Sequence, residues 1–256
     1  MPSLAEARLA VTIIQIVAYV LLLSKLFRSR LYEKYRYFSF LIFADAARLA
    51  FMASLKPRTD FYAYSYIATG PIIWILLVLV VLEFFHLILR NHIGIASIGK
   101  KAVTVALIVS AAISAGTLLL DLQRTSAEAA VLFNFMLLER LVTTSLLLLL
   151  LCLVIFASHF PVPVSRNIRT HASIFAVFFA GRTAILFLRM WFGLDVVAVL
   201  NFALQSLGAA CLIAWIVLLD PAGEQLPAPQ VANASERRLL EQLEAINESL
   251  LRSARK

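Results

Sequence analysis

Residues 64–89 read YSYIATGPIIWILLVLVVLEFFHLIL, and this stretch decides the fold class because one helix of this length and composition can cross a bilayer. About 20 consecutive apolar residues suffice for a crossing. Further runs of the same kind occur at 9–27, 37–55, 102–120, 130–157, 172–192 and 196–219. They lack the period-2 alternation of transmembrane strands. The sequence therefore predicts an all-α membrane protein, with a seven-transmembrane-helix bundle over residues 1–220.

The composition agrees with this class. Hydrophobic residues make up 62% of the chain and charged residues 15%, and the mean hydropathy is +0.89. A soluble domain is about 45–50% apolar and about 25% charged, so a soluble enzyme domain is excluded. The net charge of +8 fits basic cytoplasmic loops. We therefore expect membrane lipids as partners and no nucleic acid.

Basic residues predict the direction of the spans. The first, third and fifth loops carry Lys25, Arg28, Arg30, Lys34, Arg36, Arg90, Lys100, Lys101, Arg166 and Arg169. The even loops carry only Lys56, Arg58 and Arg124. Because positive residues accumulate on the cytoplasmic side, the N-terminus is predicted outside and the C-terminus inside.

The composition changes after Asp220. Residues 221–232 read as a Pro-rich linker, and a short cytoplasmic amphipathic helix is expected over 233–256. Its apolar seam has heptad spacing and consists of Leu239, Leu243, Ile246 and Leu250. Such a helix could lie on the inner membrane surface, or it could be a coiled-coil-like partner helix that forms a homodimer or docks on another protein. The balanced charge and the lack of Trp and Phe favour the partner helix.

Polar residues within the apolar runs form a candidate core. Charged residues in spans usually face the bundle interior. The candidate residues are Asp45, Arg48, Glu139, Arg140, Arg182, Asn201 and Gln205. One interpretation is a network of ion pairs that fixes the helix register, with Asp45 or Glu139 paired to Arg182. The other is a cavity for a ligand or ion, where the excess of arginine would suit a carboxylate or phosphate group.

Glu83 and His86 place a carboxylate and an imidazole on one helix face, as a metal site requires. A di-iron bundle needs two such pairs, and the chain has one. His86 and His171 lie near the cytoplasmic ends of their runs, so together they could supply axial ligands to haem. A histidine at the membrane interface without a cofactor is the simpler interpretation, and we expect no cofactor or metal.

The sequence has no P-loop, HExxH or GxSxG motif, so no catalytic nucleophile or metal centre is visible. All lysines lie outside the middle of the runs, which excludes a retinal Schiff base in the bundle. A non-enzymatic role is therefore favoured.

Four stretches carry a family resemblance: KLFRSRLYEKYRYFSFLIFADAAR (25–48), VLEFFHLILR (81–90), LLERLVTTSLLLLLL (137–151) and QLEAINESLLRSARK (242–256). In the order of these features, the chain resembles a group of uncharacterised seven-helix membrane proteins that are abundant as paralogues in Acidobacteria-type bacterial genomes. This resemblance implies a multi-pass protein of the bacterial inner membrane. It implies no activity, so no residue inherits a role.

Three functions remain open. The favoured one is a non-enzymatic module for ligand sensing and signalling, or an assembly subunit, that acts through its cytoplasmic partner helix. The second is a carrier or channel for a small solute or ion that uses the polar core. The third is a haem- or metal-binding membrane subunit.

Overall fold

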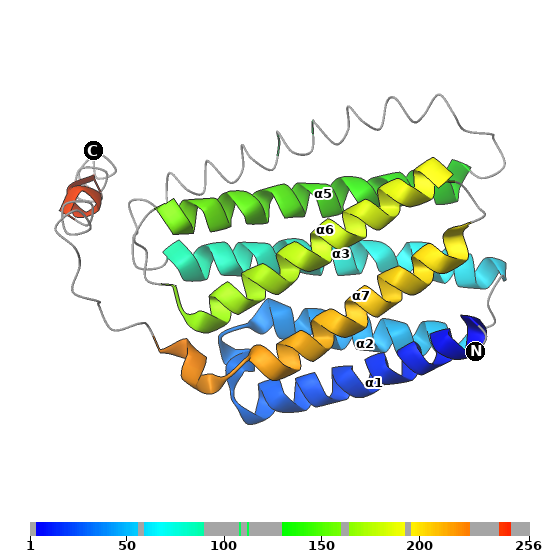
Figure 1. Cartoon of the computed structure of the whole chain (residues 1–256), viewed down its shortest axis with the longest axis horizontal. Helices are drawn as coiled ribbons and strands as arrows, with labels where there is room; N and C mark the ends of the chain where they lie inside the picture. Colours follow the sequence, from blue (N-terminus) through cyan, green and yellow to red (C-terminus); the bar gives the residue numbers. More distant parts are fainter. Residues whose placement is uncertain are drawn as a thin grey trace.

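A computed structural model of the chain is shown in Figure 1. It describes residues 4–55, 59–89, 108, 112, 130–159, 164–192, 196–225 and 241–246. The predicted run 102–120 therefore lies outside the described residues, apart from two isolated positions. The linker residues 226–232 and most of the predicted tail helix also lie outside them.

Every regular element among the described residues is helical. Six helices in this part of the chain are long and apolar enough to cross a membrane. They are α1 (Leu4–Arg28), α2 (Arg36–Ser54), α3 (Asp60–Leu89), α5 (Ala130–His159), α6 (Arg166–Phe192) and α7 (Val197–Leu218). The short 3₁₀ helices η1 (Leu31–Glu33) and η4 (Pro221–Glu224) follow α1 and α7. The prediction of an all-α, multi-pass membrane architecture is confirmed at this level.

The long helices form a closed ring. Each packs against the next described helix in the chain, from α1 to α2, α3, α5, α6 and α7, and α7 packs back against α1 (Figure 1). The interior is rich in aromatic and branched side chains, among them the fully buried Phe38, Phe84, Phe175 and Phe179. Large apolar residues such as Phe43 also cover the outside. Apolar surface on both sides is what a bundle surrounded by lipid requires.

The contact between α1 and α7 is the closing seam of the ring. Arg8 Nη2 donates to the carbonyl oxygen of Ala198 at 2.8 Å, and Gln205 Nε2 donates to Thr12 Oγ1 at 2.6 Å. Gln15 Nε2 donates to the carbonyl oxygen of Gln205 at 3.0 Å. Residues nearer the start of α1 contact residues nearer the start of α7, and later residues contact later ones. The two helices therefore run parallel.

The helices α3 and α5 are also parallel neighbours (Figure 1). Trp74 in the first half of α3 stacks on Phe135 in the first two turns of α5, with ring centroids 4.8 Å apart. The end of α3 and the start of α5 therefore lie at opposite ends of the bundle. We call the end that holds η1 and η4 the η end; α3 ends there, and α5 begins at the other end.

Three helices begin at least four residues earlier than the apolar runs predict. The α1 helix starts at Leu4 rather than 9. The α3 helix starts at Asp60 rather than 64, and α6 starts at Arg166 rather than 172. Side chains just before them act as caps: the Tyr62 amide donates to Thr59 Oγ1 at 3.2 Å, and the Ile168 amide donates to Ser165 Oγ at 3.4 Å. A capped polar turn extends a helix beyond its apolar segment, so a hydropathy window underestimates its length.

Candidate functional site

The polar core is centred on a buried ion pair between α5 and α6. Glu139 is 2% exposed, and its Oε1 accepts from Arg182 Nε at 3.1 Å and pairs with Arg182 Nη2. The hydroxyl of Tyr66, on α3, donates to Glu139 Oε2 at 3.4 Å. An unpaired buried charge is strongly destabilising, so these contacts explain how Glu139 is accommodated. They connect three helices through one carboxylate.

The two charged residues within the apolar run of α2, Asp45 and Arg48, contact tyrosines. The hydroxyl of Tyr19, on α1, donates to Asp45 Oδ2 at 2.5 Å. The Arg48 guanidinium carbon lies 4.7 Å from the ring centroid of Tyr66, which is a cation–π distance. Sequence reasoning missed both tyrosines because it considered only charged and amide side chains. A hydroxyl in an apolar run needs a partner when buried, and that signal could have found them.

The sequence predicts either Asp45 or Glu139 as the partner of Arg182, and in the structure Arg182 pairs with Glu139. Arg140 is 3% exposed, and its guanidinium carbon lies 4.6 Å from the Phe187 ring centroid. Gln205 contacts α1 at the closing seam rather than the charged residues. Asn201 is exposed on α7, so the structure does not place it in the core. It lies two turns or less from the start of α7, where a neutral amide is not forced inward.

The core contacts favour the interpretation as a structural network. Both carboxylates accept hydrogen bonds from side chains of neighbouring helices, and the arginines lie on a carboxylate or on aromatic rings. Such pairing holds the helices at one register. A transport site would instead need charged groups that face an open cavity.

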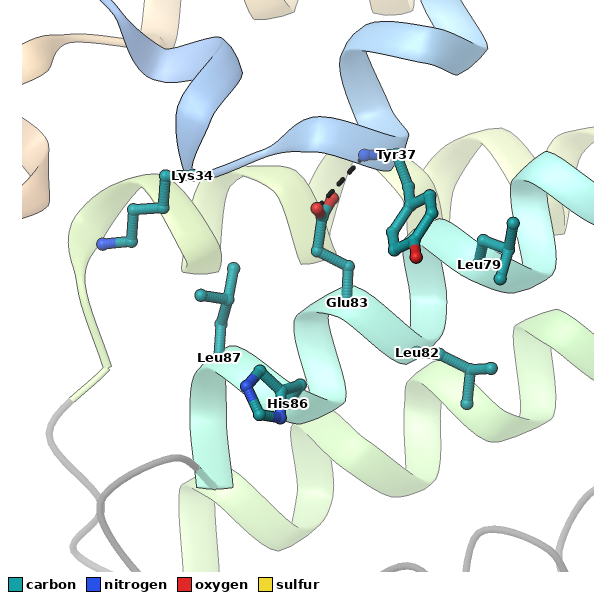
Figure 2. A pocket seen from close by; sticks show the side chains of 7 residues that line it. All are labelled: Lys34, Tyr37, Leu79, Leu82, Glu83, His86 and Leu87. Atoms are coloured by element: carbon teal, nitrogen blue, oxygen red, sulfur yellow. Dashed lines mark hydrogen bonds between the residues drawn. The ribbon is translucent and has the colours of Figure 1, made fainter.

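Glu83 caps α2 from the neighbouring helix. Its Oε1 accepts from the Tyr37 amide at 3.1 Å, and its Oε2 accepts from the Phe38 amide at 3.3 Å (Figure 2). The first turn of a helix has amides without intrahelical acceptors and a positive dipole end. An anionic carboxylate satisfies both. The Glu83 carboxylate therefore has a structural role that requires no metal.

His86 and His171 have different environments. His86 is exposed on α3, whereas His171 on α6 is fully buried. The His171 ring centroid lies 4.6 Å from that of Tyr35 and 4.5 Å from that of Phe38. Neither of its ring nitrogens has a hydrogen-bond partner among the described residues. The enclosed His171 is not among the residues that line the pocket beside His86.

No group of three His, Cys, Asp or Glu residues that could hold a metal occurs within the described part of the chain. The pocket that His86 lines has a volume of about 340 Å³ and lies between the start of α2 and the last turns of α3 (Figure 2). Glu83 reaches into the space between the two helices, and leucines of α3 form much of the wall.

At the η end, the segment after α7 is fixed to the bundle by a second polar cluster. Glu224, in η4, accepts from the Tyr35 hydroxyl at 2.7 Å and from Asn167 Nδ2 at 2.6 Å. It also forms an ion pair with Lys34. We call Lys34, Tyr35, Asn167 and Glu224 the tail anchor. It joins the starts of α2 and α6 to η4.

The tail anchor is closely packed. Asn167 and Tyr35 are both fully buried, and Asn167 Nδ2 also donates to the carbonyl oxygen of Asp220 at 2.7 Å. Gly223 lies against the Asn167 side chain, with no room for a β-carbon. Burial and the hydrogen bond to Glu224 raise the pKa of the Tyr35 hydroxyl well above its ordinary value.

Part of the predicted linker is ordered against the bundle. The prediction begins the linker at 221, but Pro221–Glu224 is η4, and Asp220 Oδ1 accepts from the Ala222 amide at 3.1 Å. Proline at the first position favours this turn. Farther along, residues 241–246 are helical, with Leu243 buried and Ile246 49% exposed. Leu239 and Leu250 lie outside the described residues.

No family model, curated protein or solved structure matches the chain. The fold defines the class, a multi-pass helical membrane protein, and the function has to be argued from the two polar clusters.

Proposed function

We propose that the chain is a non-enzymatic membrane module, a ligand-sensing or assembly subunit, that presents its C-terminal segment to a protein partner. The tail anchor is the observation that carries this proposal. It fixes the start of the C-terminal segment to two helices through Glu224, whose partners include the fully buried Tyr35 and Asn167. Buried polar contacts of this kind would not be needed if the position of the C-terminal segment had no role.

The two polar clusters share helices, which supports a route between the bundle and the tail. Tyr35 is the N-cap residue of α2, and this helix carries Asp45 in its middle. The start of α6 carries Asn167, and the same helix carries Arg182. A ligand or partner that changes the pairing in the core would therefore move the helices that hold η4. Coupling of this kind requires two states with different affinities.

The path of the chain between α3 and α5 supports the count of seven spans. Because α3 ends at the η end and α5 begins at the opposite end, the chain has to return along the length of the bundle between them. The apolar run 102–120 has the length for one crossing. We infer that it supplies the seventh span.

The charge distribution supports the proposed orientation. The η end carries Lys25, Arg28, Arg30, Lys34 and Arg166. By the positive-inside rule, this end faces the cytoplasm, with the C-terminal segment inside and the N-terminus outside. The resemblance noted above supports a bacterial inner membrane as the proposed location.

The proposal is tested by native mass spectrometry of the protein extracted gently from its own membranes. We expect the full chain to carry a stoichiometric partner or second copy, and a chain lacking residues 233–256 to lose it. Leu243→Glu should cause the same loss, because Leu243 belongs to the predicted apolar seam, whereas Glu241→Gln, at an exposed site outside the seam, should not. A bare full-length monomer, or a partner that stays on the truncated chain, would refute the proposal.

A further inference from the structure

The pocket between α2 and α3 differs from the polar core because it opens on the outside of the bundle. Its lining includes Leu82, which is 36% exposed, and the exposed His86. It lies beside the last turns of α3, where the apolar span that ends at Ile88 meets the η end. In a membrane, this is the level at which headgroups replace acyl chains.

The pocket combines an apolar wall with a rim of both charges. Leu79, Leu82 and Leu87 form the wall. The rim carries the Glu83 carboxylate and, farther out, the Lys34 ammonium group (Figure 2). Lys34 uses one of its three N–H donors on Glu224, and its side chain is 35% exposed. His86 adds a ring N–H at the same rim.

These charges restrict the chemistry of the ligand. The Glu83 carboxylate would repel a purely anionic headgroup, and the Lys34 ammonium group would repel a purely cationic one. We propose that the pocket binds one phospholipid whose headgroup carries both a phosphate and a primary amine. The phosphate accepts from Lys34 and His86, the amine donates to Glu83, and an acyl chain lies on the leucines. A primary ammonium group has three N–H donors, which a trimethylated amine lacks.

The test uses the purified full-length chain in detergent, with phosphatidylethanolamine, phosphatidylglycerol and phosphatidylcholine of the same acyl chains added in equal amounts. Native mass spectrometry then measures which lipid stays bound. We expect one phosphatidylethanolamine to be retained in preference to the other two. Preference for phosphatidylglycerol, or equal retention of all three, would overturn the proposal.

A matched pair of variants tests whether the pocket holds the lipid. Leu82→Trp fills the pocket and should lower the retention of phosphatidylethanolamine about tenfold, by loss of contacts on the apolar wall. Ile75→Trp makes the same change at an exposed position on α3 outside the lining, and retention should stay as in the wild type. An equal response of the two variants would contradict the proposed site.

Glu83→Gln tests the contact to the amine. Glutamine keeps one acceptor for the α2 amides but loses the charge, so the preference over phosphatidylcholine should fall roughly tenfold. A thermal unfolding curve shows whether the variant folds, and Leu82→Trp provides the test if it does not.

Soluble glycerophosphoethanolamine should displace the lipid only weakly. Binding as tight as that of the lipid would mean that the ligand is a soluble molecule and would overturn the proposal.

Discussion

Glu139 shows how a single carboxylate can set the positions of three helices. It accepts from Arg182 on α6 and from Tyr66 on α3 while it is itself buried on α5. The Glu139 side chain is 3% exposed and the Arg182 side chain 14%, so each charge depends on the other for compensation. Removing one partner of the pair should therefore lower the stability of the fold strongly.

Glu139→Gln should lower the free energy of unfolding by about 3 kcal/mol, because it leaves the Arg182 guanidinium buried without its counter-charge. The double variant Glu139→Gln/Arg182→Met should recover part of that loss. The measurement is unfolding of the purified chain in detergent, with Glu33→Gln on the exposed surface of η1 as the control. Additive losses in the double variant would show that the two side chains act independently.

Tyr35 provides a pH-dependent test of the tail anchor. Its folded pKa is raised, by burial and by Glu224, above the unfolded value of about 10. As the pH rises, the Tyr35 hydroxyl therefore ionises in the unfolded chain before it ionises in the folded protein. The stabilisation that it provides is lost as the pH rises above about 10. Below that pH, the free energy of unfolding of the wild type should exceed that of Tyr35→Phe by about 1 kcal/mol, and this difference should shrink at higher pH.

Thermal unfolding of both proteins between neutral and strongly alkaline pH measures this difference directly. A Tyr32→Phe variant reports the effect of removing an exposed hydroxyl. A constant gap between wild type and Tyr35→Phe across the range would contradict the role given to the Tyr35–Glu224 bond.

Sequence predicted the members of the polar core better than their partners. The cost of charge in lipid is enough to predict that Glu139 and Arg182 face inward. The choice of Glu139 over Asp45 depends on the rotation of α5 against α6, which residue spacing does not determine. The tail anchor was missed because Asn167 and Glu224 lie 57 positions apart and match no local pattern.

At the scale of the elements, η4 is held by polar contacts and close packing, and its buried residue is Gly223. It is a single turn held by the tail anchor and by the fit of Gly223 against Asn167. A side chain at 223 would displace the amide that bonds to both Asp220 and Glu224. The conformation of this element therefore depends on one position without a side chain.

Gly223→Ala should loosen η4 without unfolding the bundle. The cost of overpacking, about 1–2 kcal/mol, corresponds to roughly tenfold faster amide exchange at residues 223–225. Hydrogen–deuterium exchange measures this, with Ala222→Ser at the exposed neighbouring position as control. Unchanged exchange at 223–225 would show that the Asn167 side chain adapts freely.

At the scale of the whole molecule, the positions of the long helices along the chain are the property that sequence predicts most completely. Apolar length predicts each described long helix within a few residues at most ends. The order of packing around the ring, and the closing seam between α1 and α7, depend on side-chain fit and could not be predicted this way.

Reporter fusions test the predicted topology. A cytoplasmic reporter joined after residue 97 or after residue 256 should be active, and one joined after residue 125 should not. An exported reporter should give the opposite pattern, because the run 102–120 is expected to cross. Equal activity of the fusions at 97 and 125 would mean that this run does not cross.

The closing seam has a consequence for biosynthesis. Arg8, Thr12 and Gln15 lie in α1, which is synthesised well before α7, the helix that carries their partners Ala198 and Gln205. Until the ribosome has completed α7, these side chains have to find temporary partners or a chaperone. A chain truncated before α7 would keep them exposed to lipid, which provides a chemical signal by which membrane proteases could distinguish unfinished copies from complete ones.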